Sequence, residues 1–378
     1  MISINQAFDA GNIDVIDAAN HQSIQLKIRA DTQADFFQWF YFRVTGARDT
    51  PLSMSILNAD EAAYVGGWEG YQALASYDQQ EWFRVPTDYV DGQLVIAHEP
   101  ECDSVYYAYF APYSLARHQQ FIAQMQCDTL CSLEVLGQSL QGRDLDMLQI
   151  GEDDGHKKRV WMIARQHPGE SMAQWFAEGF LLRLLERDDA LVETVLSETV
   201  FYVVPNMNPD GSTLGNLRTN AAGVNLNRVW GKADLETSPE VFYVQQKMQA
   251  TGCDLFLDIH GDETLPWNFI AGQKGLPVDE AILQQEADFQ IHYEQINPDF
   301  QCVHGYPAKK FGGESLTLAS NWVGNCFGIA SMTLEMPFKD NKGRPDPECG
   351  WSAERSLQLG ASIVYPIAKH FKASLNTP

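Results

Sequence analysis

The sequence is poor in basic residues and lacks long apolar runs. Lys and Arg together number 26 against 50 Asp and Glu, which gives a formal net charge of −24 at pH 7. A surface of that charge repels phosphate backbones and anionic lipids, so neither nucleic acid nor a membrane is an expected partner. No stretch approaches the roughly 18 consecutive apolar residues of a membrane-spanning helix.

Cysteine is scarce, and a secretion signal is missing. The seven cysteines are odd in number and scattered along the chain, which favours reduced thiols over a disulfide framework. Cys127 and Cys131 lie close together, but no second Cys or His pair follows to complete a structural zinc site. The N-terminal segment has no basic stretch followed by an apolar one. We therefore expect a cytoplasmic protein, and nothing in the sequence indicates its oligomeric state.

The chain divides into two patterns of different kind. Residues 1–113 contain short alternating or aromatic runs, such as SIQLKIR, LSMSILNAD and SVYYAYFAPY, separated by Gly, Asp and Pro. This spacing predicts an N-terminal antiparallel β-sandwich domain. In residues 114–378, strand-length runs such as RVWMIARQ alternate with helical patterns such as SMAQWFAEGFLLRLLERDD. That alternation predicts an α/β domain with a mixed, mostly parallel, doubly wound sheet flanked by helices.

Polar residues follow the predicted strands at the point where each strand ends. RVWMIARQ leads directly into His167 and Glu170, CDLFLDI leads into His260, and IASMTL leads into Glu335. In a doubly wound sheet, functional sites form at the carboxyl ends of the strands. We therefore expect these four side chains to lie close together.

These residue types suit a catalytic zinc site. His167, Glu170 and His260 form a His₂Glu ligand set that leaves a fourth position open for water. Glu335 is placed to take the proton of that water while the zinc polarises a carbonyl group. An isolated H-x-x-E pair is more often an ordinary ion pair, and a histidine at a strand end is often only a packing residue. The occurrence of all four at strand ends favours the metal site.

A basic segment lies between the two halves of this ligand set. LRTNAAGVNLNRVW contains Arg218, Asn227 and Arg228. It is either a solvated loop or an anion clamp, because the planar guanidinium group matches a carboxylate. In so acidic a chain, arginines beside a predicted zinc site favour the clamp.

The motifs H-P-G-E, N-P-D-G, N-L-N-R and a late T-L-E, in this order, resemble the zinc metallocarboxypeptidase family typified by pancreatic carboxypeptidase A, peptidase family M14. LGQSLQGRDLDMLQIG is similar to the first strand region of that family. FQWFYFRVTG and YFAPYS resemble the β-sandwich that precedes the catalytic domain in the cytosolic carboxypeptidase subfamily. The resemblance implies a carboxypeptidase-like α/β fold and one Zn²⁺ per chain.

The resemblance also implies catalytic roles. His167, Glu170 and His260 would bind the zinc ion. Glu335 would act as the general base and then protonate the leaving amine. Arg218 would polarise the scissile carbonyl group and stabilise the oxyanion.

Substrate binding follows from the same resemblance. Asn227 and Arg228 would hold the terminal carboxylate of a peptide or protein tail, which makes the enzyme an exopeptidase. Tyr306 would be the mobile tyrosine that covers the terminal residue, although a tyrosine in a surface loop is an equal alternative.

The preferred terminal residue stays open at this stage. Deglutamylating cytosolic carboxypeptidases have a basic residue in the specificity pocket, whereas ESLTLASNW places Leu318 or a neighbour there. Lys309 and Lys310 are candidates to replace that basic residue, so a preference for acidic or glutamate endings is one alternative. Two other interpretations of the chain stay open. One is a zinc amidohydrolase or deacylase of small N-acyl amino acids, and the other is a non-catalytic binding module.

Overall fold

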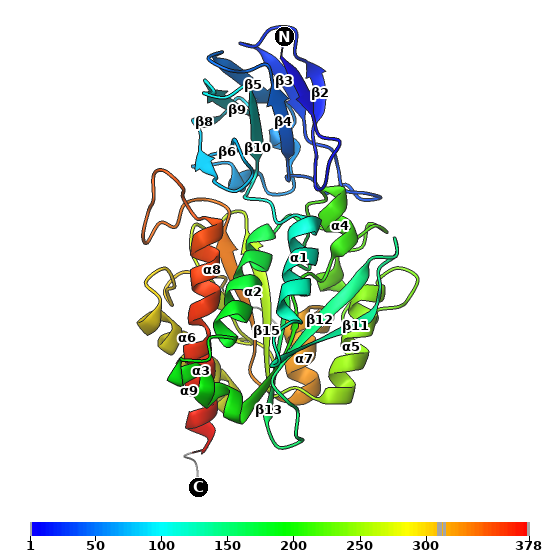
Figure 1. Cartoon of the computed structure of the whole chain (residues 1–378), viewed down its shortest axis with the longest axis vertical. Coiled ribbons are helices and arrows are strands. Elements are labelled where there is room, and N and C mark those ends of the chain that lie inside the picture. Colours follow the sequence, from blue (N-terminus) through cyan, green and yellow to red (C-terminus); the bar gives the residue numbers. More distant parts are fainter. Residues whose placement is uncertain (1, 308–311, 313–314, 376–378) are drawn as a thin grey trace.

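The alternating runs of the N-terminal third form short strands that bury one face. The computed structural model describes residues 2–307, 312 and 315–375, and its first 108 residues contain two small sheets (Figure 1). The first sheet has the order β1 (Ser3–Asn5), β4 (Tyr41–Thr45), β10 (Ser104–Ala108), β6 (Leu74–Ser76) and β7 (Phe83–Arg84). The second has the order β2 (Asp14–Asp17), β3 (Ile24–Lys27), β5 (Leu52–Ile56), β9 (Gln93–His98) and β8 (Thr87–Val90).

The antiparallel prediction for this domain is confirmed with one exception. β3 and β5 pair in parallel, whereas every other strand pair among the described residues of these two sheets is antiparallel. The chain crosses into the other sheet through β4 between these two strands, so it returns in the original direction. Buried aromatic side chains, among them Trp39, Phe40 and Tyr107, fill the core of the domain.

The remainder of the chain folds around a larger mixed sheet. Its order is β11 (Cys131–Gln138), β12 (Asp144–Ile150), β14 (Thr199–Val204), β13 (Lys158–Ala164), β15 (Leu255–Asp262), β17 (Ser331–Pro337) and β16 (Phe269–Ala271). The central strands β14, β13, β15 and β17 run parallel, and the edge strands are antiparallel to their neighbours. The mixed sheet predicted from the sequence is therefore confirmed.

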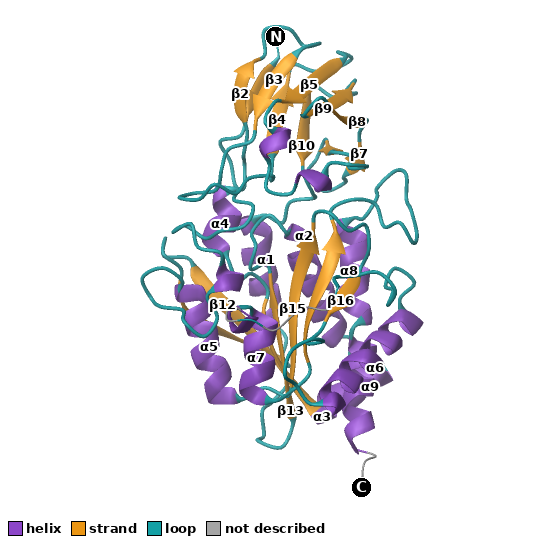
Figure 2. Cartoon of the chain, turned by 180° about the vertical axis from the view of Figure 1, so that it is seen from behind, coloured by secondary structure: helices purple, strands orange, loops and turns teal. Residues whose placement is uncertain are grey.

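Helices cover both faces of this sheet, as the continuous apolar strands require. The helices are α1 (Leu115–Met125), α2 (Ser171–Leu184), α3 (Ala190–Glu198), α4 (Pro209–Leu214), α5 (Pro239–Thr251), α6 (Glu280–Ile296), α7 (Ala319–Phe327), α8 (Ala353–Ser362) and α9 (Val364–Leu375). On β13, Val160 and Met162 pack into one core cluster, and Trp161 and Ile163 pack into another. Figure 1 shows α2 and α8 in front of the sheet, and Figure 2 shows α5 and α7 on the opposite side.

Two glycines allow α2 and α8 to touch backbone to backbone. A Cβ atom on Gly179 would lie 2.0 Å from the carbonyl oxygen of Leu357, and one on Gly360 would lie 2.0 Å from that of Phe176. No side chain fits at either position, so glycine sets the distance between these helices.

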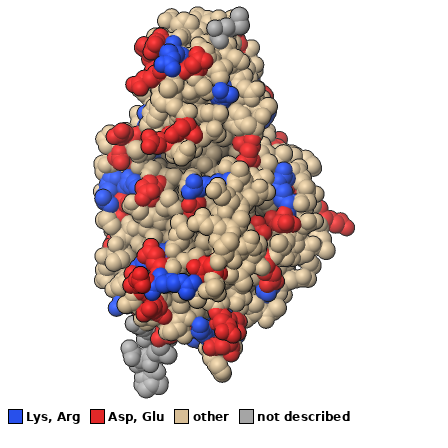
Figure 3. Space-filling view, in the orientation of Figure 1, with Lys and Arg blue, Asp and Glu red and all other residues tan. Residues whose placement is uncertain are grey.

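The surface reflects the acidic composition. Figure 3 shows Asp and Glu side chains on both parts of the visible face, with fewer Lys and Arg between them. No helix among the described residues is both long enough and apolar enough to span a membrane.

Candidate metal centre

The predicted ligands stand at the carboxyl ends of neighbouring parallel strands. β13 ends at Ala164, and a tight turn then brings His167 and Glu170 to the start of α2. β15 carries His260 near its end, and the register partner of His260 on β17 is Glu335. The four side chains therefore meet at one edge of the sheet, where ligand sites form in folds of this class.

The three ligand side chains converge on one point. Nδ1 of His167 lies 2.6 Å from Oε1 of Glu170, and Nδ1 of His260 lies 2.7 Å from Oε2 of the same carboxylate. The two Nδ1 atoms are 3.2 Å apart. All three side chains are buried, and their donor atoms lie within 4.8 Å of one another. Two imidazole nitrogens and a carboxylate oxygen are a ligand set that Zn²⁺ prefers.

Neighbouring side chains orient the two imidazole rings. Oδ1 of Asn225 accepts the backbone N–H of Asn227 and lies 3.1 Å from Nε2 of His167. Oδ2 of Asp258 lies 2.9 Å from Nε2 of His260. An oxygen at each Nε2 selects the tautomer with the proton on Nε2, which leaves the Nδ1 lone pairs directed at the Glu170 carboxylate. A cation between these acceptor atoms relieves their repulsion, so the residues present fit a metal ion.

Asn225 and Asp258 contact the two histidines, and the sequence analysis assigns neither of them a task. A signal for Asp258 exists, because a residue two positions before His260 on a strand points to the same face. Gln166 extends this network, since its Nε2 donates to Oδ2 of Asp258 at 2.7 Å. Asn225 is the first residue of the N-L-N-R motif, but its contact with His167 joins segments 58 residues apart and is visible only in the structure.

The electrostatics differ among the three candidate ligands: His167 and Glu170 are held in the forms that bind a metal, whereas the surroundings of His260 favour positive charge. Burial and the charge of Arg218 lower the pKa of His167 to about 3. Burial raises the pKa of Glu170, but His167 and His260 lower it by more, so the net pKa lies below its ordinary value. Burial lowers the pKa of His260, whereas Asp258 and Glu170 raise it, and the net pKa lies well above its ordinary value. The Asp258 and Glu170 carboxylates therefore stabilise positive charge at the position of His260.

A cavity of about 590 Å³ opens over this cluster, and Glu335 lines it. Oε2 of Glu335 is buried and has no hydrogen-bond partner in the part of the chain that the structure describes. Burial is the main cause that raises the pKa of Glu335, and His260 opposes it. An unpartnered carboxyl oxygen next to a metal site has room for a water molecule and can exchange a proton with it.

The other predicted site residues line the same cavity, namely Arg218, Asn227, Arg228, Tyr306 and Leu318. Asn227 accepts the backbone N–H of Ala319 at 2.8 Å, and its Nδ2 lies 3.4 Å from Nε2 of His260. The exposed Arg228 donates to the carbonyl oxygen of Asn227 at 2.7 Å. Tyr306 donates to Oδ2 of Asp262, and 39% of the tyrosine is exposed. Lys309 and Lys310 lie outside the described residues.

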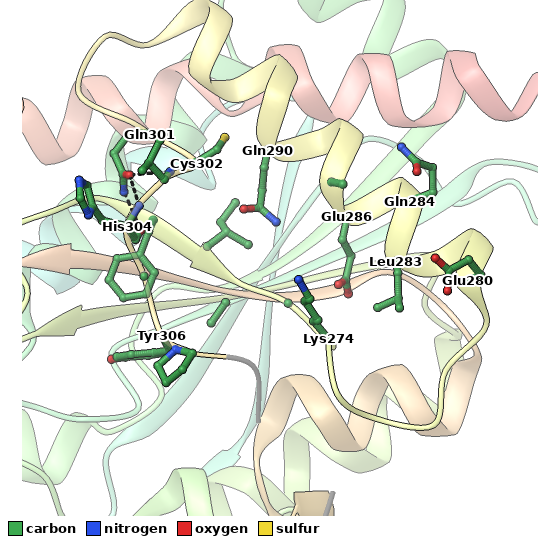
Figure 4. A pocket seen from close by; sticks show the side chains of 18 residues that line it. Lys274, Glu280, Leu283, Gln284, Glu286, Gln290, Gln301, Cys302, His304 and Tyr306 are labelled. Carbon is green, nitrogen blue, oxygen red and sulfur yellow. Dashed lines mark hydrogen bonds between the residues drawn. The ribbon is translucent and has the colours of Figure 1, made fainter. Parts of the chain in front are cut away.

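A larger cavity of about 730 Å³ adjoins the first but does not include the metal cluster. Ala271, Gly305, Tyr306 and Pro307 line both cavities. Figure 4 shows Glu286 and Gln290 pointing into this cavity from α6, with Tyr306 at one end. The candidate ligand set therefore makes the smaller cavity the candidate functional site.

Comparisons with known proteins show which family the chain resembles as a whole. Residues 4–110 match the model of the cytosolic carboxypeptidase N-terminal domain, and residues 118–343 match the zinc carboxypeptidase model. The crystal structure of a metallo-carboxypeptidase from Burkholderia cenocepacia is 47% identical, covers 99% of this chain and 100% of that chain, and has a TM-score of 0.97.

Two further relatives are similar over nearly all of this chain. The metallo-carboxypeptidase from Pseudomonas aeruginosa, in complex with (2-guanidinoethylmercapto)succinic acid, is 44% identical with a TM-score of 0.95, and the match covers 98% of this chain and 99% of that chain. Cytosolic carboxypeptidase 6 from Mus musculus is 26% identical, over 98% of this chain and 73% of its own length.

Proposed function

This chain belongs to the zinc carboxypeptidase family and is a metallocarboxypeptidase, and we propose that it uses one zinc ion to release the C-terminal residue of peptides or protein tails. His167, Glu170 and His260 hold the ion in this proposal. The observation that carries it is the convergence of two Nδ1 atoms and one carboxylate beside Oε2 of Glu335, which has no hydrogen-bond partner among the described residues. A zinc ion in this site supplies a Lewis acid for hydrolysis without a covalent intermediate.

Each predicted site residue other than the metal ligands has a separate task in the proposed reaction. Glu335 removes a proton from the attacking water and returns it to the leaving amine. Arg218 donates hydrogen bonds to the carbonyl oxygen as negative charge develops there. Asn227 and Arg228 hold the terminal carboxylate, so an amidated peptide is a poor substrate. Tyr306 covers the terminal residue from the loop above the cavity.

The lining of the cavity bears on which terminal residue is preferred. Among its described residues, Arg218 and Arg228 are the cationic side chains, and both already have tasks in this proposal. Leu318, Ser320 and Thr333 contribute uncharged surface. An acidic ending requires a further cation, whereas an uncharged ending requires none. We therefore propose uncharged endings over the glutamate preference that the sequence leaves open.

We also propose a division of the chain and a location. The N-terminal domain comprises residues 1–113 and the catalytic domain residues 114–378. This division is supported by the separate family matches at 4–110 and 118–343. The names of the cytosolic relatives support a cytoplasmic location. We further propose that (2-guanidinoethylmercapto)succinic acid, the compound bound to the Pseudomonas aeruginosa relative, inhibits this enzyme.

Mass spectrometry of C-terminal trimming tests the proposal. Zinc-loaded protein is incubated with peptides that end in Glu, Asp, Lys, Leu or Phe, and chelated protein and amidated peptides serve as controls. We expect metal-dependent loss of single terminal residues from free C-termini, fastest for the uncharged endings. Failure to trim any peptide would contradict the proposal and favour an amidohydrolase of small N-acyl amino acids.

A further inference from the structure

The loop that carries Arg218 is bonded to the N-terminal sandwich along its length. Figure 2 shows the arrowhead of β15 directed toward that sandwich, so the sandwich stands over the edge of the sheet that holds the site. Three hydrogen bonds flank Arg218 in this contact. They join Asn12 to the carbonyl oxygen of Gly215 (2.9 Å), Thr32 to Oδ1 of Asn216 (3.1 Å) and Gln33 to the carbonyl oxygen of Ala221 (3.2 Å).

One buried carboxylate of the sandwich holds the centre of this loop. Asp31, 4% exposed, accepts the backbone N–H groups of Leu217, Arg218 and Thr219 at 2.6, 2.8 and 2.9 Å. It also accepts the hydroxyl group of Thr219 at 3.0 Å. Hydrogen bonds to an ionised acceptor are stronger than neutral ones. Four bonds to one carboxylate fix three consecutive peptide units, and Arg218 is the middle one.

The side chain of Arg218 is also held by the sandwich. Its guanidinium carbon lies 5.4 Å from the ring centre of Tyr64 and 5.9 Å from that of Phe36. Cation–π contacts of this kind restrict where the guanidinium group can point. The backbone of Tyr64 is in turn fixed by Gln38, which accepts its N–H at 2.8 Å and donates to its carbonyl oxygen at 3.1 Å.

We propose that Asp31 is a positioning residue for catalysis, because it fixes the backbone of Arg218, whose side chain lines the cavity over the candidate metal centre. The N-terminal sandwich is then a part of the active site. This inference rests on the proposed function and on the role of Arg218 within it. Preorganised donors are effective only when they are fixed before the reaction, so loosening the loop removes transition-state stabilisation.

Steady-state kinetics of Asp31→Asn and Asp78→Asn test the inference. Asp78 is the matched control, because it also accepts backbone N–H groups in the N-terminal domain, from Gln80 and Glu81, outside the metal cavity. We expect Asp31→Asn to lower kcat about tenfold or more while KM stays within about threefold, since the oxyanion contact forms in the transition state. Asp78→Asn should keep the wild-type values.

A double mutant separates positioning from general destabilisation. If Asp31 acts through Arg218, then Asp31→Asn costs no further activity in an Arg218→Ala background. An equal loss in both backgrounds would overturn the inference. Phe36→Leu is a second variant at a partly exposed position, and it should lower kcat without changing the thermal midpoint. Unchanged kcat in both Asp31→Asn and Phe36→Leu would also overturn it.

Hydrogen exchange of the loop gives a readout without turnover. We expect the amides of residues 217–219 to exchange faster in Asp31→Asn than in the wild type, because their acceptor is weakened. Unchanged exchange would show that Asp31 does not hold the loop. If the wild type trims peptides and the variants are as active as the wild type, this inference fails while the proposed function stands. If the wild type trims no peptide, the proposed function fails as well.

Discussion

At the scale of single residues, the centre combines ligands, orienting groups and a separate acid–base residue. His167, Glu170 and His260 contact one another, while Glu335 contacts none of them in the hydrogen bonds of the described chain. This separation has a consequence for mutagenesis. A side chain that binds the metal and a side chain that moves protons should respond differently to isosteric replacement.

Glu335→Gln should abolish turnover and keep the metal. Gln cannot accept the proton of water, so we expect kcat to fall by at least about 10³-fold. Bound zinc should stay near one ion per chain, because residue 335 is not a ligand in the proposal. Trimming assays together with elemental analysis of the purified variant measure both. A variant that loses its zinc would show that Glu335 has been assigned the wrong role.

Asp258→Asn should weaken metal binding. Asn keeps the shape of the side chain but loses the negative charge 2.9 Å from Nε2 of His260. Side chains that orient a histidine ligand typically contribute 10- to 100-fold to metal affinity, so we expect a loss of about that size. Competition with a chromophoric chelator measures the zinc dissociation constant.

Asp254→Asn is the control for that measurement. Asp254 precedes the same strand at its opposite end, where it contacts Lys158 and Arg159, outside the metal cavity. The control should bind zinc with wild-type affinity. Equal zinc affinity in both variants would mean that Asp258 does not support His260.

At the scale of secondary structure, the order of elements could be predicted, but their close contacts could not. The apolar runs before His167, His260 and Glu335 predict three strands, and the structure has β13, β15 and β17 there. The parallel pairing of β3 with β5 was not predictable, because local alternation carries no information about which strands become neighbours. The close helix contacts at Gly179 and Gly360 were not predictable either, because a glycine within a helix is by itself only unfavourable.

Gly179→Ala should destabilise the protein although alanine favours helices. The new Cβ atom would lie 2.0 Å from the carbonyl oxygen of Leu357, so α2 and α8 must separate. Overpacking of this kind costs about 1–3 kcal/mol, more than the gain of about 1 kcal/mol in helix propensity. Urea denaturation measures the free energy of unfolding. Gly66→Ala is the control, because its Cβ meets only a methyl group at 3.7 Å, and a loss of equal size there would contradict the packing argument.

At the scale of the whole molecule, the cavity over the candidate metal centre is lined by a loop that a distant part of the chain holds in place. Asp31 and the loop it holds are separated by 186 to 188 residues. A pattern that covers a few neighbouring positions cannot report such a contact. The sequence therefore indicates which residues carry the chemistry, while the structure alone indicates which residues hold them.

Several of the acidic groups behind the net charge of −24 are buried, and Glu240 is one that lies outside the candidate metal centre. Glu240 in the first turn of α5 is fully buried. Its Oε2 accepts a hydrogen bond from Asn220 at 3.3 Å, and its Oε1 has no partner among the described residues. Burial raises the pKa of Glu240 from 4.5 to about 7, and the bond from Asn220 opposes this rise.

This raised pKa predicts how stability depends on pH. Between about pH 4.5 and pH 7 the folded state binds more protons at Glu240 than the unfolded state does. Its contribution to the free energy of unfolding is therefore fully present below pH 4.5 and is lost as the pH rises through 7. The loss amounts to roughly 3 kcal/mol at about 1.4 kcal/mol per pKa unit.

Glu240→Gln should remove this pH dependence, because glutamine does not ionise. Relative to the wild type, the variant should gain roughly 3 kcal/mol in the free energy of unfolding between pH 5 and pH 8. Urea denaturation at the two pH values measures that gain. Glu236→Gln, an exposed position just before α5, is the control and should leave the pH dependence of the wild type unchanged. If Glu240→Gln and Glu236→Gln share one pH profile, then Glu240 is ionised in the folded protein and its burial does not govern stability.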